Sequence, residues 1–206
     1  MKVICINGSP NEHGCTDAAL KEVEGALRRR GIQTERVYLG KRPVPGCIGC
    51  RECQQTGRCI QNDGVNDLLE KLDEIDALVV GSPVYYAGPS GQVTAFLDRL
   101  FYAAGGRMAG KLGAAVVSCR RGGASAAFDR LNKYFTISNM PVVSSQYWNQ
   151  VHGNTPEEVA QDAEGLQTMR TLGENMAWLL QSIEAGRKAG VPAPSYEATT
   201  YTNFIR

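Results

Sequence analysis

The sequence predicts an α/β domain with a five-stranded parallel sheet and helices on both faces. Short β-branched runs alternate along the chain with stretches that have the apolar spacing of helices. Several of these runs end in loops rich in Gly, Ser and Pro, as strands that lead into helices often do. Strands that alternate with helices imply a parallel sheet covered on both sides. The length of 206 residues suits one domain with a single sheet.

The first three elements are a strand, a helix and a strand. Residues 3–6 form a short apolar run that is typical of a buried strand. A helix is expected over 16–30, with Thr16 as its N-cap and Gly31 as its end. Polar and apolar residues alternate over 33–39, which predicts the second strand.

A long loop interrupts the pattern after the second strand. Residues 40–62 are rich in Gly, Pro and Cys, and a structureless loop of this length is usually functional. The helical spacing of 64–74 and the apolar run 77–80 predict a helix and a third buried strand. A helix over 91–101 is expected to follow the Gly-Ser-Pro sequence at the end of this strand.

The second half of the chain continues the alternation. The sequence predicts a fourth strand over 113–118, a helix over 124–135 and a fifth strand over 141–145. Leucine and methionine recur at three- and four-residue steps within 156–186, which predicts one long helix. Beyond Gly190 the chain is expected to be extended and irregular.

Five strands fit a flavodoxin-like sheet, with strand order 2-1-3-4-5, better than a six-stranded dinucleotide fold. We expect one domain over 1–190 that includes a Cys-rich loop over 43–62. The remaining segment, 191–206, is expected to be an extended tail at an oligomer interface. Ligands of open α/β sheets bind at the carboxyl ends of the strands, so the strand-end loops are the place to look for a site.

Composition excludes several classes of function. The formal net charge is +1, which gives no electrostatic basis for binding nucleic acid or an anionic membrane. The apolar stretch at the N-terminus is too short for a signal peptide or a membrane span. We therefore expect a cytoplasmic protein, in which the seven cysteines are reduced, reactive or metal-binding rather than paired in disulfides.

The most specific motif is a run of cysteines in the long loop. Four cysteines fall inside thirteen residues with the spacing C-x2-C-x2-C-x5-C: Cys47, Cys50, Cys53 and Cys59. Thiolates are soft ligands, and four on one short loop can surround a [4Fe–4S] cluster. A ferredoxin run ends in C-x3-C-P, and its last cysteine binds a second cluster. This chain has a five-residue last gap, no following proline and no second cysteine run. The motif predicts one cluster at most.

Three alternatives for the cysteine run remain open. The loop can be ordered and hold no metal. It can bind zinc, although structural zinc sites usually pair two separated Cys-x2–4-Cys knuckles. A disulfide between two of the thiols can also form on oxidation, although the cytosol disfavours it.

The loop over 7–16 joins the first strand to the first helix. Backbone N–H groups and the helix dipole favour a phosphate at such a place. The loop lacks the P-loop lysine and the GxGxxG glycines, but it offers the polar side chains of Ser9, Asn11 and Thr16. It predicts a site for a monophosphate, and the alternative is a plain Gly/Pro turn with a capped helix.

Two further strand-end loops carry weaker patterns. Tyr85 and Tyr86 lie in the loop 81–90, where adjacent tyrosines can flank a flat ring or simply be half-buried. Two arginines and two glycines occupy the loop 118–123. Glycines permit close approach of a ligand, and an arginine can meet negative charge on a flavin or on a nicotinamide cofactor, or can be solvated.

Taken together, these loops and the cysteine run resemble the NADPH-dependent FMN reductase family, and within it the iron–sulfur flavoprotein branch. The matching segments are Asn-Gly-Ser-Pro at 7–10, Gly-Cys-Thr at 14–16, the cysteine run, Gly-Ser-Pro-Val-Tyr at 81–85, Phe-Leu-Asp-Arg at 96–99 and Arg-Arg-Gly-Gly at 120–123. One departure is Thr94, where relatives often carry a lysine.

The resemblance implies FMN as cofactor and a homodimer or homotetramer with the flavin near a subunit interface. It places the phosphate at the 9–17 loop and the ring between the loops 83–86 and 118–123. The cofactor-binding residues it implies are Ser9, Asn11, Cys15, Thr16, Asp17, Pro83, Val84, Tyr85, Tyr86, Ser118, Arg120 and Gly123.

The expected function is an FMN-dependent oxidoreductase that takes electrons from NAD(P)H or a ferredoxin-type donor. Its acceptor would be a small molecule such as a quinone, a nitro compound or an azo compound, with the cluster as an intermediate carrier. No catalytic acid or base is required, because the redox chemistry belongs to the flavin. One alternative is an electron carrier for a protein partner, and another is a zinc-stabilised α/β binding protein without enzymatic activity.

Overall fold

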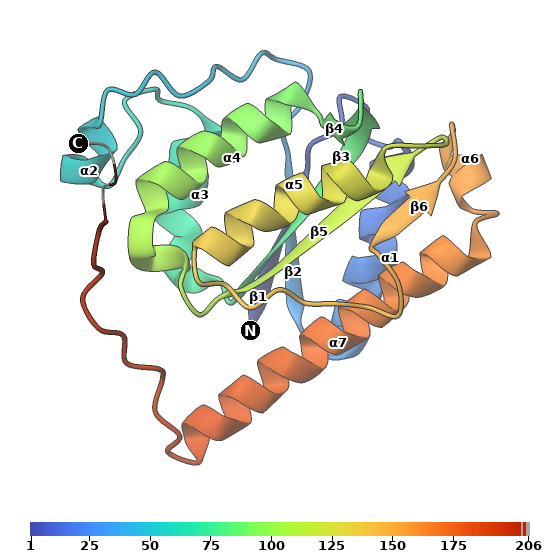
Figure 1. Cartoon of the computed structure of the whole chain (residues 1–206). Coiled ribbons are helices and arrows are strands. Elements are labelled where there is room, and N and C mark those ends of the chain that lie inside the picture. The colour runs from blue at the N-terminus through green and yellow to red at the C-terminus, as the bar shows by residue number, and fades with distance from the viewer. Residues whose placement is uncertain (203, 205–206) are drawn as a thin grey trace.

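The computed structural model describes residues 1–202 and 204, and its centre is one twisted sheet (Figure 1). Its parallel strands lie in the order β2 (Gln33–Tyr38), β1 (Lys2–Asn7), β3 (Ala77–Tyr85), β5 (Leu112–Cys119) and β6 (Gln150–His152). The two-residue strand β4 (Gly88–Pro89) pairs antiparallel with the end of β3. With β4 set aside, the predicted flavodoxin-like order of five parallel strands is confirmed.

Helices cover both faces of the sheet. The α-helices are α1 (Cys15–Arg29), α2 (Glu52–Thr56), α3 (Gly64–Lys71), α4 (Gly91–Ala104), α5 (Ala124–Ile137), α6 (Pro156–Val159) and α7 (Ala163–Lys188). Short 3-10 turns follow α3 and α4, at Leu72–Glu74 and Gly105–Met108. Helices α1 and α7 pack on one face, and α3, α4 and α5 pack on the other.

Strand β1 shows why the apolar runs become central strands. Val3 and Cys5 belong to the core beneath α1 and α7, whereas Ile4 and Ile6 belong to the core beneath α3, α4 and α5. All four side chains are fully buried. A strand buried on both faces needs a continuous apolar run rather than an alternating one, which is the pattern that the sequence has here.

The predicted fifth strand over 141–145 is wrong. Only Val142 makes a bridge there, to Gly113, and the edge strand proper is β6, which pairs with the last residues of β5. Val142 pairs with Gly113 of β5, and Gln150 pairs with Val117 of the same strand. Because the segment from Val142 to Gln150 is longer than the segment from Gly113 to Val117, the chain between Val142 and Gln150 must loop out. Ser145 holds this loop by bonding the side chain of Asn149 at 2.8 Å.

The predicted single helix over 156–186 is two helices, because Asp162 breaks it. Its carboxylate accepts hydrogen bonds from the backbone N–H of Gly165 (2.9 Å), which caps α7, and of His152 (2.7 Å). Aspartate favours the N-cap over the helix interior for this reason. The break ties the start of α7 to the end of β6.

Two smaller expectations are also corrected. Thr16 is not the N-cap of α1: Gly14 occupies that position, and Thr16 lies inside the first turn. The segment 40–62 is not wholly without structure, because it contains α2.

The tail after α7 has no helix or strand over 190–202. The expectation that 191–206 lies at an oligomer interface falls partly outside the described residues, since 203, 205 and 206 are not among them. Among the described helices, none combines the length and apolar composition needed to cross a bilayer.

Candidate functional site

The loop between β1 and α1 is fixed at the carboxyl end of the sheet. Its Gly8 N–H donates to the carbonyl of Gly81 at 2.9 Å, and its carbonyl accepts from Ser90 Oγ at 2.7 Å. A side chain at Gly8 would lie 2.6 Å from Cβ of Val93, so only glycine allows this approach. The first loop is thereby joined to the end of β3 and to the start of α4.

The same loop holds several backbone N–H groups that have no partner among the described residues. Ser9 is buried, and its hydroxyl accepts from the N–H of Asn11 at 3.1 Å. Within the part of the chain that the structure describes, five N–H groups find no acceptor: those of Glu12, His13, Cys15, Thr16 and Asp17. Free amides at a helix start are the donors that a phosphate requires.

Thr16 connects this loop to the end of β5. Its hydroxyl lies 2.8 Å from that of Ser118, and both residues are buried. Cys15 makes a weaker contact, with its sulfur 3.6 Å from the carbonyl oxygen of Gly153, and burial raises the pKa of its thiol.

The carboxylate of Asp17 lies among basic side chains, one of which is the His13 ring with Nδ1 3.6 Å away. The carboxylate pairs with Arg36 Nη1 at 2.6 Å and with Lys21 Nζ at 2.8 Å. Burial would raise the pKa of Asp17, but the hydrogen bonds and charges of Lys21 and Arg36 outweigh it and hold the pKa below its usual value. Asp17 therefore anchors the first turn of α1 to β2.

The lowered pKa of Asp17 predicts a pH-dependent effect of Asp17→Asn. The charged carboxylate stabilises the folded state at neutral pH, and this contribution is lost as pH falls through the folded-state pKa. We expect the free energy of unfolding of the variant to be about 2 kcal/mol lower than that of the wild type near pH 7. The difference should shrink below about pH 4. Urea unfolding at several pH values measures it, and an equal difference at all pH values would contradict this role.

The end of β3 forms a tight hairpin with β4. Val84 pairs with Pro89 and Tyr85 with Gly88, so Tyr86 and Ala87 make a two-residue turn. Both turn residues have positive φ, 49° and 60°, a conformation that non-glycine residues adopt at a cost and that clusters at ligand sites. The turn leaves the Tyr86 side chain fully exposed and Tyr85 about half-exposed.

The loop after β5 packs against this hairpin at Gly123. With φ of +90°, Gly123 brings its backbone so close that a Cβ would lie 2.8 Å from Cα of Ala87 and 3.2 Å from Val84 Cγ1. Arg120 and Arg121 in the same loop are exposed. The three strand-end loops singled out in the sequence therefore meet at one edge of the sheet.

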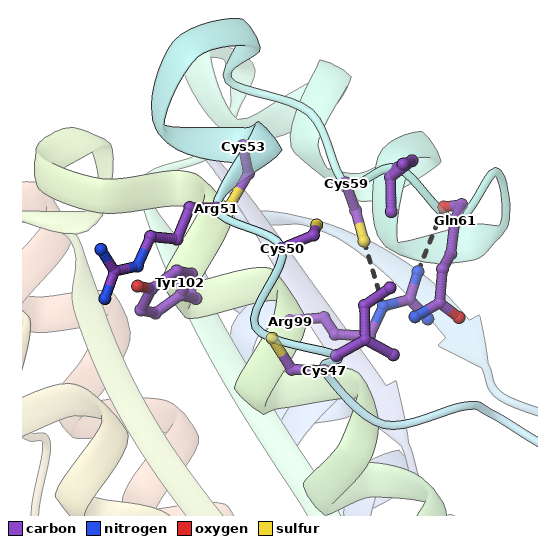
Figure 2. Close-up of a pocket in the computed structure, with 10 residues that line it drawn as sticks. Cys47, Cys50, Arg51, Cys53, Cys59, Gln61, Arg99 and Tyr102 are labelled. Atoms are coloured by element: carbon purple, nitrogen blue, oxygen red, sulfur yellow. Dashed lines mark hydrogen bonds between the residues drawn. The ribbon is translucent and has the colours of Figure 1, made fainter.

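The cysteine run forms a second site beside α4. One pocket is lined by Cys47, Cys50, Cys53 and Cys59, together with Ile48, Arg51, Ile60, Gln61, Arg99 and Tyr102. Figure 2 shows the four sulfur atoms arranged around the same space. Burial, and then the charges of the other three thiols, raise the pKa of Cys53, although its backbone hydrogen bond opposes them. The other three thiols therefore lie near Cys53.

The shared pocket does not by itself make the four thiols a metal-ion site. Among the described residues, no group of three or more His, Cys, Asp or Glu side chains is arranged to hold a metal ion. A tetrahedral zinc ion requires four sulfurs close around a single centre, about 2.3 Å from it. Four thiolates are, by their chemistry, the ligand set of a [4Fe–4S] cluster. This donor set fits an iron–sulfur cluster.

Two polar residues hold the cysteine loop, and the sequence patterns did not single out their role. Asn66 accepts from the Cys59 N–H at 2.8 Å and donates to its carbonyl at 2.9 Å. Arg99 lies beneath the pocket, and its Nε is 3.2 Å from Cys59 Sγ. A charged residue on the otherwise apolar face of α4 was the available indication. Burial would lower the pKa of Arg99, but hydrogen bonds to Asp63 and Cys59 outweigh it and raise the pKa.

The sheet order and the strand-end loops define a protein of the flavodoxin fold. A flavodoxin from the domain Archaea superposes with a TM-score of 0.60 at 18% identity, over 88% of this chain and 99% of that one. An NAD(P)H:quinone oxidoreductase from Methanothermobacter marburgensis gives a TM-score of 0.66 at 16% identity, over 85% and 96%. These likenesses show the shared fold.

The sequence over residues 1–155 matches the model of the NADPH-dependent FMN reductase family, and the chain belongs to this family. It is therefore an FMN-dependent oxidoreductase. An iron-sulfur flavoprotein from Methanocaldococcus jannaschii is 34% identical over 192 residues, which are 89% of this chain and all of that protein. The resemblance noted in the sequence is confirmed for the family, and the relative's name agrees with the suspected branch.

Proposed function

We propose that this protein passes electrons from NAD(P)H, or from a ferredoxin-type donor, to a small acceptor such as a quinone, a nitro compound or an azo compound. In this proposal FMN binds at the sheet edge and one [4Fe–4S] cluster binds in the cysteine pocket. The observation that best supports this proposal is that helix α4 connects the loop of free backbone amides with the pocket of four thiols. Its N-cap Ser90 is bonded to Gly8 of the first loop, and Arg99 and Tyr102 on its later turns line the pocket of four thiols.

The FMN phosphate is proposed to lie on the free amides of the first loop. Ser9, Asn11 and Thr16 contribute their side chains, and Cys15 and Asp17 contribute the N–H groups that find no acceptor among the described residues. Because the Asp17 carboxylate is held by Arg36, it does not repel the phosphate at close range. Neutral hydroxyls and amides can hold a monophosphate without a lysine.

The flavin ring is proposed to lie between the hairpin and the loop after β5. Pro83, Val84, Tyr85 and Tyr86 form one side, and Ser118, Arg120 and Gly123 form the other. When bound, FMN supplies the ability to accept a hydride and to release electrons singly. The protein's part is to position the ring with backbone groups and to place the charge of Arg120 near it. We propose no catalytic side chain.

The cysteine pocket is proposed to hold the cluster through Cys47, Cys50, Cys53 and Cys59. Three observations support this: the four thiols share one pocket, Arg99 directs an N–H toward Cys59 Sγ, and a relative is named an iron-sulfur flavoprotein. When bound, such a cluster supplies one-electron transfer. Structural zinc sites usually pair two separated Cys-x2–4-Cys knuckles, whereas these four cysteines belong to one continuous run.

The buried pair of hydroxyls gives a test of the phosphate site. Thr16→Val keeps the shape of the side chain but removes the bond to Ser118, and we expect FMN to bind about tenfold more weakly. The measurement is the FMN dissociation constant from fluorescence titration of the flavin-free protein. As a control, Thr56→Val lies in the cysteine loop and should leave FMN affinity unchanged. Wild-type affinity in Thr16→Val would contradict the placement.

The proposed reaction is tested by rapid mixing under anaerobic conditions. NADPH and NADH, each added separately, should bleach the flavin absorption, and a quinone added afterwards should restore it. A colourless preparation would contradict FMN binding. A yellow protein that neither nicotinamide nor a reduced ferredoxin-type donor bleaches would contradict the proposed donors.

A second candidate function is an electron carrier for a protein partner. The observation that favours it is the exposure of the cysteine site: Cys47 and Cys50 are exposed, and Ile48 between them is 69% exposed. An apolar side chain beside an accessible redox group suits contact with another protein. Fast steady-state turnover of NAD(P)H with a quinone favours the reductase, whereas slow turnover with rapid reduction by a ferredoxin-type donor favours the carrier.

A further inference from the structure

Arg99 occupies a position on α4 where an apolar residue is expected. It lies one turn after Phe96 and one turn before Ala103, both of which are buried in the core. The Arg99 side chain itself has no exposed surface. A buried arginine is costly unless its charge and its donors are satisfied, so its partners should explain why it is there.

A carboxylate compensates the charge of Arg99. Asp63 accepts two hydrogen bonds from the guanidinium, at 2.7 Å from Nη1 and 2.8 Å from Nη2. This two-point pairing fixes the plane of the guanidinium. The third guanidinium nitrogen, Nε, lies 3.2 Å from Cys59 Sγ. The ion pair therefore serves to hold one N–H in position at a sulfur of the cysteine pocket.

The same guanidinium also contacts both ends of the cysteine loop. Nη1 is 3.4 Å from the carbonyl oxygen of Pro45, which precedes Cys47. Nη2 donates to the carbonyl of Gln61, which follows Cys59, at 3.1 Å. The Arg99 side chain thus joins the beginning and the end of the cysteine loop. Figure 2 shows its bonds to Gln61 and Cys59.

We propose that Arg99 is the positioning residue of the cysteine site: it holds the two ends of the loop together and donates a hydrogen bond to Cys59, which strengthens cluster binding and raises the cluster's reduction potential. The inference rests on the proposed cluster. Hydrogen bonds to the sulfurs and nearby positive charge stabilise the more negative, reduced form of a cluster. Groups that orient metal ligands typically change metal affinity about 10- to 100-fold when they are removed.

The test compares three changes in the full-length, FMN-loaded protein purified without oxygen. Arg99→Gln removes the positive charge and the contacts with both ends of the cysteine loop. Arg99→Gln combined with Asp63→Asn removes the carboxylate that the single change leaves unpaired. Arg99→Lys keeps a positive charge but cannot make the forked contacts. Arg107→Gln is the matched control, because Arg107 bonds Asp73 and the Leu69 carbonyl away from the pocket.

Three measurements follow the site without using enzyme activity. They are iron and sulfide per FMN, the cluster's midpoint potential followed by electron paramagnetic resonance, and hydrogen exchange of the amides in 45–61. In both Gln variants we expect iron retention against a chelator to fall about 10- to 100-fold and exchange over 45–61 to rise about tenfold. Any cluster that remains should have a lower potential, and Arg99→Lys should lie between these variants and the wild type.

The outcomes separate this inference from the proposed function. Iron-free wild-type protein, even after anaerobic reconstitution, would refute the cluster, and the exchange measurement would then decide the loop contact alone. If the wild type binds iron and the Arg99 variants match Arg107→Gln in iron retention, midpoint potential and hydrogen exchange, the proposed role of Arg99 is overturned. Increased exchange throughout the chain with loss of FMN from the double variant would also overturn it, because Arg99 would then be a general core residue.

Discussion

Replacing Cys50 by alanine is expected to abolish iron binding and to leave FMN in place. Cys50 lines the pocket together with the other three cysteines of the run, and a cubane that loses one of four thiolates is bound much more weakly. Among the described residues, the hydrogen bonds of the strand-end loops involve none of the four pocket cysteines, so the flavin site should not change. Iron, sulfide and extracted flavin per chain are the quantities to measure.

The control for this change lies in the same loop. The Gln54 side chain is exposed and, among the described residues, bonds only the hydroxyl of Tyr102, so Gln54→Ala should keep both iron and FMN. If Cys50→Ala loses flavin as well as iron, the cysteine loop is part of the flavin site. The separation of the two sites along α4 would then be wrong.

Replacing Gly123 by valine is expected to weaken FMN binding by about a hundredfold. The position has φ of +90°, which a β-branched residue adopts only with strain, and its new Cβ would lie 2.8 Å from Cα of Ala87. The loop 118–123 must therefore move away from the hairpin, and the two sides of the proposed ring site separate. Titration of flavin-free protein with FMN measures the effect.

The neighbouring glycine provides a close control. A side chain at Gly122 would meet no described residue within 4 Å, and the φ of Gly122 is not positive. Gly122→Val should accordingly bind FMN nearly as well as the wild type. Equal affinities for the two variants would show that contact between this loop and the hairpin does not shape the flavin site.

The sequence predicts the central sheet well because local composition and burial agree there. Strand β1 is apolar on both sides, and its four buried apolar residues face two cores. Parallel strands with helical connections leave few possible arrangements. The position of the loops then follows from topology, since the carboxyl ends of parallel strands lie at one edge.

The parts that the sequence could not predict depend on contacts between distant residues. The helix over 156–186 is interrupted because Asp162 bonds the backbone of His152, and no local pattern reveals that partner. The fifth strand fails over 141–145 because the chain loops out against β5. In the sequence Arg99 is one charge on an otherwise apolar face of α4, and its role is visible only when Asp63 and Cys59 are seen beside it.

The most direct test of the central claim is the absorption spectrum of the protein after anaerobic purification. The proposal of FMN at the sheet edge and one cluster in the cysteine pocket predicts flavin bands together with a broad shoulder at longer wavelength. Dithionite should bleach both features, and the iron and sulfide content should correspond to one cluster per chain. Resolved flavin bands without the shoulder would contradict the cluster, if the iron content of the protein also stays near zero after reconstitution. Absence of the flavin bands would contradict both FMN binding and the proposed function.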